Sequence, residues 1–266
     1  KSKKTIKENP LDSIVILDKT KTEQSWDNPL DNIIFKINPK AEVTIHNIYK
    51  DTNVIVIDDF LLNIDELSNQ NKLDRIIEKS YKTWDDEHPY PGLQHPLNLN
   101  NSNQIDKIIK KLVNNKLTKF SETKLENDPV LSVGMKFKEK NIFTTNPHID
   151  VNSRYSYAAM LYLNKPDDCY EGTGIYESKL INNIYPYING QYIGEDKFYN
   201  LYKENSEIIR DSNSHWKLIH VLKMKYNRLV IYESSLFHSM YLKSFDLFKK
   251  HRYTINMWFD SPNAII

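Results

Sequence analysis

Apolar and polar residues alternate through much of the second half of the chain, in short runs rich in β-branched and aromatic residues. This alternation is typical of half-buried β-strands, because successive side chains on a strand point to opposite faces. Beyond residue 130 the pattern predicts strands over the ranges 131–137, 156–163, 216–222, 228–232 and 252–259. An earlier run at 54–60 fits the same pattern. We therefore expect a mainly β protein.

Segments in the first half show the spacing of amphipathic helices instead. Asn63, followed three residues later by Glu66, predicts a capped helix start, and this helix would run to about Trp84. A second helix is predicted to begin near Asn101 or Ser102. Its apolar stripe has three- and four-residue spacing and consists of Ile105, Ile108, Ile109, Leu112, Val113, Leu117 and Phe120. We expect both helices to cover the outer face of the larger sheet.

The remaining segments are expected to be irregular. Three prolines and a glycine predict a loop over 88–96, and the stretch 176–215, rich in Tyr, Asn, Lys and Glu, reads as an insert. We expect the whole chain, residues 1–266, to be a single domain. Within it, 1–50 would be an N-terminal arm, 51–128 a strand with supporting helices, and 129–260 the β core that carries the insert.

Composition narrows the choice of partners. The chain has 36 Lys and Arg against 35 Asp and Glu, a net charge of +1, which argues against a nucleic-acid partner. The single cysteine, Cys169, excludes an intramolecular disulfide and fits a reducing compartment. No apolar run approaches the roughly 20 residues of a membrane span. We therefore expect a cytoplasmic protein without a membrane or nucleic-acid partner, and its oligomeric state stays open.

The clearest chemistry lies in His148-Ile149-Asp150. On an extended strand residues i and i+2 point the same way, so His148 and Asp150 can reach one metal ion while Ile149 faces the opposite side. His238, 90 residues after His148, follows the predicted strand 228–232, which would deliver it at its end. Two imidazoles and one carboxylate on one face of a metal leave three positions open, an arrangement typical of non-haem Fe(II) oxygenases.

An arginine at the start of the last predicted strand is a candidate for binding a carboxylate. Arg252 lies 14 residues past His238 and opens the predicted strand 252–259. By alternation Arg252, Thr254 and Asn256 share one face. A guanidinium beside a hydroxyl is a suitable receptor for a carboxylate, because its planar fork can bind both oxygens.

Together these residues resemble the 2-oxoglutarate/Fe(II)-dependent oxygenases, closest to the prolyl-hydroxylase-like branch. The motifs that carry the resemblance are His148-x-Asp150, Tyr162-Leu163-Asn164 followed by Gly172-Thr173-Gly174, Arg228-Leu229-Val230-Ile231-Tyr232, His238 and Arg252-x-Thr254. They cover about residues 130–260, with a weaker echo at 54–61.

The resemblance implies a double-stranded β-helix, or jelly roll, that holds Fe(II) through His148, Asp150 and His238. It further implies 2-oxoglutarate and O2 as co-substrates and hydroxylation of a C–H bond, with release of succinate and CO2. The substrate would be of amino-acid type, a small molecule or a residue of a peptide. Asp150 favours a hydroxylase over a halogenase, since related halogenases carry a small residue in place of the carboxylate.

The same resemblance implies a binding site for the distal carboxylate of 2-oxoglutarate. Arg252 would pair with that carboxylate, Thr254 would assist, and Tyr162 would donate its hydroxyl. Asn256, on the same face, is a further candidate.

Some features of the sequence leave alternatives open. The interval from His238 to Arg252 is longer than the family pattern, and Gly172-Thr173-Gly174 replaces the expected Gly-Gly. His215, His220 and His251 compete with His238 as the second histidine ligand. We prefer His238, because a site built on His220 with Arg228 leaves the last strand without a role. A non-catalytic jelly-roll binding module, for instance a virion-associated one, is the alternative function.

Overall fold

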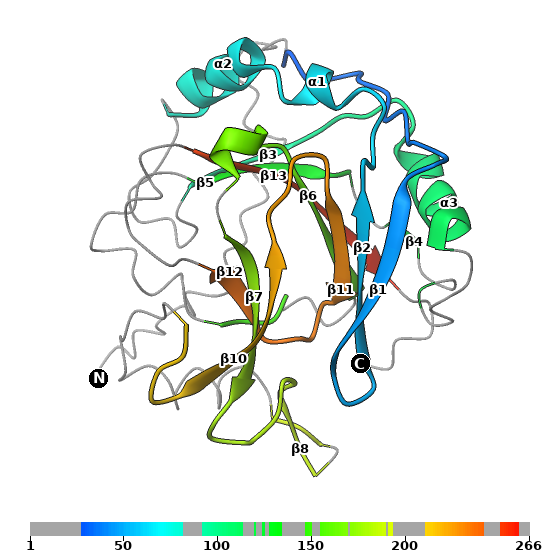
Figure 1. Ribbon diagram of the computed structural model, residues 1–266. Helices are drawn as coiled ribbons and strands as arrows, with labels where there is room; N and C mark the ends of the chain where they lie inside the picture. The colour runs from blue at the N-terminus through cyan, green and yellow to red at the C-terminus, as the bar shows by residue number, and fades with distance from the viewer. Residues whose placement is uncertain are drawn as a thin grey trace, which may run out of the picture.

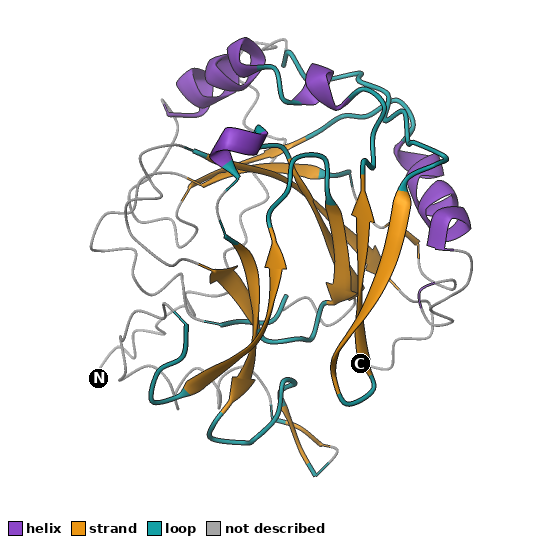
Figure 2. Ribbon diagram, viewed as in Figure 1, coloured by secondary structure: helices purple, strands orange, loops and turns teal. Residues whose placement is uncertain are grey.

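The computed structural model describes residues 28–81, 92–113, 120, 124–125, 128–134, 147–150, 155–169, 171–189, 191–193, 211–241 and 251–260. β-Strands make up most of the described fold, and the longer helices lie at its periphery (Figure 2). The helices are α1 (Ile64–Leu67), α2 (Gln70–Tyr81) and α3 (Ser102–Val113), with a short 3-10 turn at Pro166–Asp168.

A larger and a smaller antiparallel sheet form the body of the protein (Figure 1). The larger sheet runs in the order β1 (Glu42–Tyr49), β2 (Thr52–Asp58), β11 (Leu229–Glu233), β6 (Tyr155–Tyr162), β13 (Arg252–Asp260), β5 (Val130–Gly134) and β3 (Gly92–Pro96), and β4 (Lys124–Leu125) pairs with β13. The smaller sheet has the order β10 (Trp216–Lys223), β7 (Gly172–Ser178) and β12 (His238–Tyr241). A hairpin of β8 (Tyr187–Ile188) and β9 (Gln191–Tyr192) projects beside it. This is the expected double-stranded β-helix.

Alternation along the strands separates two apolar layers. On β13, Tyr253 and Ile255 belong to the cluster that also contains residues of α2 and α3, so they face the helices. Trp258, an odd number of residues away from both, packs in the other cluster, between the larger and smaller sheets. The second layer includes Tyr162 of β6 and Ile175 of β7. We call the space between the sheets the interior, and Arg252 is on the strand face that looks into it.

The strand predictions at 54–60, 156–163, 216–222, 228–232 and 252–259 are confirmed, with boundaries shifted by up to two residues. The strand predicted over 131–137 is confirmed as β5 as far as Gly134, and residues 135–137 lie outside the described part of the chain. The loop predicted over 88–96 is wrong in its second half. Gly92–Pro96 forms β3, which pairs with β5 from Gly92↔Gly134 to Pro96↔Val130. β3 is the last strand of the sheet, and an edge strand tolerates proline because its outward N–H groups need no partner. Residues 88–91 lie outside the described part of the chain.

The helix predicted from 63 to about 84 is two helices, α1 and α2, separated at Ser68 and Asn69, and residues 82–84 lie outside the described part of the chain. Asn63 makes no capping hydrogen bond. Its Oδ1 accepts the Lys36 amide N–H at 3.0 Å, and its Nδ2 donates to the Ile34 carbonyl at 2.9 Å. Asn69 caps α2 instead, since its Oδ1 accepts the Lys72 amide N–H at 3.2 Å. The prediction failed because the Asn63 side chain binds a segment distant in sequence.

The second predicted helix is confirmed as α3, and its stripe buries Ile105, Ile109 and Val113 against the larger sheet. Leu117 of the predicted stripe lies outside the described residues. Part of the predicted N-terminal arm is ordered sheet, because β1 lies within residues 1–50. The first residues of the predicted insert 176–215 belong to β7, which continues to Ser178. None of the helices in the described ranges is long and apolar enough to cross a bilayer.

Asn227, in the turn between β10 and β11, ties that turn to the segment that follows β2. It has a φ of 62° and is 6% exposed. Its Oδ1 accepts the Leu61 amide N–H and its Nδ2 donates to the Leu61 carbonyl, both at 2.9 Å. We expect Asn227→Ala to lower the free energy of unfolding by about 3 kcal/mol, because both Leu61 groups lose their partner and alanine is strained at positive φ. Urea unfolding measures the change.

Asn32 provides the matched control, because it has a φ of 61° but is exposed. We expect Asn32→Ala to cost about 1 kcal/mol, the conformational part alone. Asn227→Gly, which relieves the strain without restoring the hydrogen bonds, should fall between the two alanine variants. Equal losses for Asn227→Ala and Asn32→Ala would show that the Leu61 contacts contribute nothing.

Candidate metal centre

A pair of backbone hydrogen bonds places two imidazoles on one face. His148 and His238 form an antiparallel bridge, in which each amide N–H donates to the other's carbonyl at 2.9 Å. Residues paired in this way have their side chains on the same side of the ladder. The rings are accordingly close, with centroids 4.6 Å apart. A bridge between residues 90 positions apart in the sequence thus fixes both histidines without help from their side chains.

Asp150 joins the pair from two residues along the chain. Its amide N–H donates to the Ser234 carbonyl at 3.0 Å, which ties Asp150 to the turn that follows β11. Ile149, between them, packs with Tyr176, Trp216 and Phe237 on the opposite side. The alternation expected from the sequence therefore holds in the structure.

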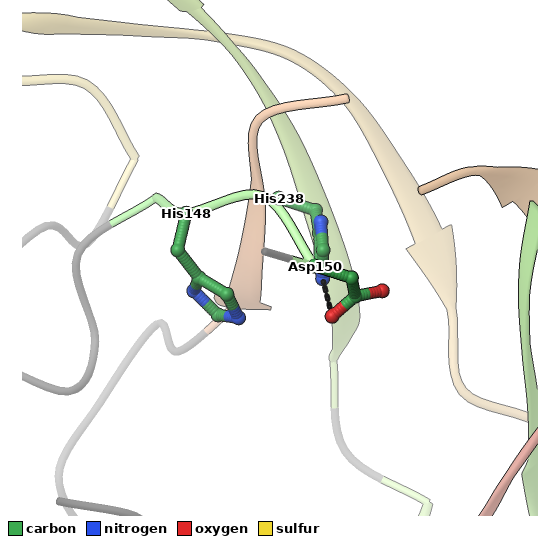
Figure 3. Close-up of side chains that lie close together, drawn as sticks. All are labelled: His148, Asp150 and His238. Carbon is green, nitrogen blue, oxygen red and sulfur yellow. Dashed lines mark ion pairs between the residues drawn. The ribbon is translucent and has the colours of Figure 1, made fainter. Parts of the chain in front are cut away.

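The side chains of His148, Asp150 and His238 point toward one another (Figure 3). One ligand atom from each residue lies within 4.8 Å of the others. The Nε2 of His238 is 3.7 Å from Asp150 Oδ1. Burial falls across the group, with His238 buried, Asp150 half-buried and His148 exposed, so the group is open on the His148 side. Nitrogen and carboxylate donors at this spacing fit a divalent transition metal.

The ring of His238 is held in one orientation. Its Nδ1 lies 2.8 Å from the Leu236 carbonyl, which can only accept a hydrogen bond. Nδ1 therefore carries a hydrogen, and in the neutral imidazole this leaves the Nε2 lone pair on the side of Asp150. A backbone carbonyl that fixes the tautomer in this way is the usual outer support of a metal-binding histidine.

The route by which His238 reaches the group differs from the sequence expectation. We expected the strand 228–232 to deliver it at its end. β11 instead ends at Glu233, and after a turn His238 opens β12 in the smaller sheet, paired with Ile175 of β7. The candidate centre therefore lies where a turn crosses from one sheet to the other.

Arg252 extends into the interior from the start of β13. Its NH2 nitrogen is 3.3 Å from the Thr173 hydroxyl and 3.4 Å from the Gly172 carbonyl. Its Cζ is 5.7 Å from the centroid of the Tyr162 ring. The Nε of Arg252 is buried and has no hydrogen-bond partner among the described residues. No carboxylate among the described residues pairs with the guanidinium.

The other residues predicted around the carboxylate share that face. Thr254 is buried and aligned across the sheet with Tyr162 and Ser132. Asn256 Nδ2 donates to the Ser132 hydroxyl at 3.0 Å. The Asn256 Oδ1 is buried without a hydrogen-bond partner in the described ranges, so this face carries an open acceptor as well as the open Arg252 donor.

Tyr162 is fully buried, and its hydroxyl already has protein partners. It lies 2.9 Å from the Thr173 hydroxyl and donates to the Leu222 carbonyl at 3.3 Å. Burial raises the pKa of the Tyr162 phenol, while the neighbouring Arg252 opposes that shift. The phenol is therefore a neutral group that positions Thr173 beside the guanidinium.

Comparison with known proteins gives a family but no activity. A sequence model described as "Family of unknown function (DUF6445)" matches residues 39–259, well over half of the chain. The chain belongs to this family. No curated protein matches it.

Three solved structures similar to the DUF6445 chain each share 12% of their sequence with it. A Trichoplax adhaerens prolyl hydroxylase, in complex with a hypoxia inducible factor oxygen degradation domain peptide fragment, has a TM-score of 0.39 and 12% identity over 79% of this chain and 84% of that one. A Pseudomonas putida prolyl-4-hydroxylase has a TM-score of 0.39 and 12% identity, over 80% of this chain and 95% of that one. An N-substituted L-amino acid dioxygenase from Burkholderia ambifaria AMMD has a TM-score of 0.36 and 12% identity, over 77% of this chain and 81% of that one.

The competing histidines of the DUF6445 chain lie elsewhere. His220 pairs with Ile175 from the β10 side while His238 pairs with it from the β12 side, so a strand separates the two histidines. The His220 ring lies beside His46, at a centroid distance of 6.1 Å. His251 precedes β13 and stacks edge-on against Tyr253, which faces the helices.

Two side chains of the candidate site were not predicted from the sequence. Thr173 lies between Arg252 and Tyr162 and is 1% exposed. The Tyr232 ring lies 4.9 Å from that of His238, and burial raises its pKa, with Asp150 adding to the rise and Arg252 opposing it. Tyr232 is thus within electrostatic reach of both Asp150 and Arg252, which ties the two parts of the site together.

Proposed function

We propose that the protein is an Fe(II)- and 2-oxoglutarate-dependent dioxygenase that hydroxylates a C–H bond of an amino-acid-type substrate, free or in a peptide, with release of succinate and CO2. The observation that carries the proposal is the combination of a His148–Asp150–His238 group with an arginine, Arg252, whose buried Nε has no partner in the described ranges. Either feature alone has a structural explanation, but a jelly roll has no structural need for both.

The donor set fits the iron. His148, Asp150 and His238 would hold Fe(II) through two nitrogens and one carboxylate oxygen, which leaves positions for a chelating co-substrate and O2. Bound iron with 2-oxoglutarate and O2 supplies the oxidising chemistry, and the protein supplies orientation and a dry site. His238 contributes a fixed lone pair because the Leu236 carbonyl holds its Nδ1–H.

The interior fits the co-substrate. Arg252 would bind the distal carboxylate of 2-oxoglutarate through its open Nε, with Thr173 and Thr254 as neighbouring hydroxyls. The surrounding interior is apolar, with Tyr162 and Tyr232 almost completely buried. Low local polarity strengthens a charge-assisted hydrogen bond and excludes water from the reacting groups.

Succinate release against a substrate panel tests the proposed reaction. We expect coupled turnover with free amino acids or peptides, and none with alkylated bases or fatty acids, because a net charge of +1 gives no surface suited to a phosphate backbone. Asp150→Ala, which removes the carboxylate ligand, is the control that should release no succinate. Turnover on alkylated bases or fatty acids alone would refute the substrate class.

A further inference from the structure

A cavity of about 340 Å³ opens at the end of the jelly roll where the β1–β2 turn, the segment before β8 and the β11–β12 turn meet. These elements lie together in the lower part of Figure 1. Its lining residues are Asp51, Thr52, Tyr185, Tyr187, Glu233 and Ser235. The wall therefore combines carboxylates, phenol rings and small hydroxyls from segments distant in the sequence.

The Glu233 carboxylate is held in place by a chain of hydrogen bonds. Tyr185 donates its hydroxyl to Glu233 Oε2 at 3.1 Å, and the same hydroxyl lies 3.0 Å from the Thr52 hydroxyl. This contact occupies one oxygen of the carboxylate. A carboxylate fixed by a half-buried tyrosine, itself held by a buried threonine, is preorganised for a ligand, because it loses little freedom on binding.

The aromatic side of the cavity is exposed. Tyr187 is 39% exposed and its ring lies 5.7 Å from that of Tyr192 on the neighbouring strand of the hairpin. No lining residue of the described cavity is cationic. Lys50, next to Asp51 in the chain, has its Nζ 4.9 Å from the ring centroid of Tyr49, outside the cavity lining. Carboxylates beside aromatic faces are the surroundings that an ammonium or guanidinium prefers.

The cavity and the candidate metal centre share one turn. Glu233 and Ser235 line the cavity, and the carbonyl of Ser234 between them accepts the Asp150 amide N–H at 3.0 Å. The same turn continues through Leu236, whose carbonyl holds the His238 ring, to His238 itself. A group bound in the cavity is therefore anchored to the backbone that positions two of the candidate ligands.

We propose that this cavity binds the cationic group of a basic substrate, the ammonium of lysine or the guanidinium of arginine. The inference rests on the proposed oxygenase function and names its substrate class. The same cation can come from a free amino acid or from a residue of a peptide, so the probes below separate these sources.

Calorimetric titration of the full chain, anaerobic and loaded with Fe(II) and 2-oxoglutarate, tests the inference. The probes are Nα-acetyl-lysine amide, Nα-acetyl-arginine amide and the uncharged Nα-acetyl-norleucine amide. We expect a basic probe to bind about tenfold or more tightly than the norleucine probe, because a hydrogen-bonded charge pair is lost with the latter. Free lysine and the pentapeptide Ala-Ala-Lys-Ala-Ala then show which source is preferred.

Glu233→Gln is the informative variant, because the amide oxygen can still accept the Tyr185 hydroxyl while the charge is removed. We expect it to lose the preference for the basic probe, a weakening of about tenfold. Glu42→Gln is the matched control. It removes the same charge from an exposed position at the other end of β1 from Asp51, and should bind as the wild type does. Thermal unfolding of both variants verifies that the fold is intact.

The outcomes separate this inference from the proposed function. Equal affinity for the lysine and norleucine probes, equal behaviour of Glu233→Gln and Glu42→Gln, or no binding of any probe would overturn the cation site. If iron and 2-oxoglutarate bind normally in those samples, the oxygenase proposal stands. Selective binding of the basic probe by a chain that binds neither iron nor 2-oxoglutarate would support the cation site and refute the proposed oxygenase function.

Discussion

Replacing His238 by alanine is expected to abolish Fe(II) binding. The Nε2 of His238 is one of the converging donor atoms, and its neighbour Asp150 Oδ1 lies 3.7 Å away. Loss of an outer-shell partner already weakens metal binding by about 10–100-fold, so loss of a ligand should exceed about 100-fold. His148→Ala should behave in the same way. Anaerobic calorimetry with Fe(II), and the iron content of dialysed protein, measure the effect.

His220→Ala and His251→Ala are the controls for this prediction. His220 lies across β7 from His238 and beside His46, and His251 stacks against Tyr253. Both variants should keep most of the iron affinity. If His220→Ala lost the metal and His238→Ala kept it, the assignment of the second histidine ligand would be wrong.

Replacing Arg252 by alanine is expected to weaken 2-oxoglutarate binding by roughly 2–5 kcal/mol, because a buried carboxylate would lose its charged partner. Iron affinity should change little, since Arg252 belongs to β13 and not to the segments that carry the candidate ligands. Titration of 2-oxoglutarate into the Fe(II)-loaded chain without O2 measures the difference. Equal affinity of the wild type and Arg252→Ala would contradict the assigned co-substrate site.

Two variants make this test specific. Tyr162→Phe should cost roughly 0.5–1.5 kcal/mol of 2-oxoglutarate binding, because it removes one neutral hydroxyl next to Thr173. Arg228→Ala removes the same charge as Arg252→Ala at a different place. Arg228 pairs through Nε and NH2 with both oxygens of Asp58, at 2.6 and 2.8 Å. It should lower stability and leave 2-oxoglutarate affinity close to that of the wild type.

Much of the fold could be predicted because alternation is a local property. The runs at 131–137 and 252–259 predict strands from their own residues, which alternate and are rich in β-branched and aromatic types. The division into a larger and a smaller sheet could not be predicted, because it depends on pairings between distant residues. His238 illustrates this, since its bridge to His148 and its pairing with Ile175 place it in the smaller sheet. The loop prediction at 92–96 failed for the same reason. The prolines favour a loop locally, but the segment forms β3 by pairing with the distant strand β5.

For the candidate site, spacing was informative wherever the residues lie on extended chain. His148 and Asp150 are on one face as i and i+2, and Arg252 shares an interior face with Asn256. Thr173 was missed because Gly172-Thr173-Gly174 was considered only as a departure from the Gly-Gly of the family pattern, whereas it is part of β7. Gly172 has a φ of 144°, and a Cβ there would lie 2.0 Å from the Leu222 carbonyl oxygen, so glycine is required. Tyr232 could have been found, since alternation places it on the same face as the interior residue Val230.

The visible absorption of the anaerobic complex tests the central claim most directly. When Fe(II) and 2-oxoglutarate are both added to the wild-type chain without O2, we expect an absorption band that neither addition produces alone. The band should be absent from His238→Ala, while Arg252→Ala should need a higher 2-oxoglutarate concentration to reach it. A wild-type chain that develops no such band at saturating concentrations of both would contradict the account and favour a jelly roll that binds its ligand without catalysis.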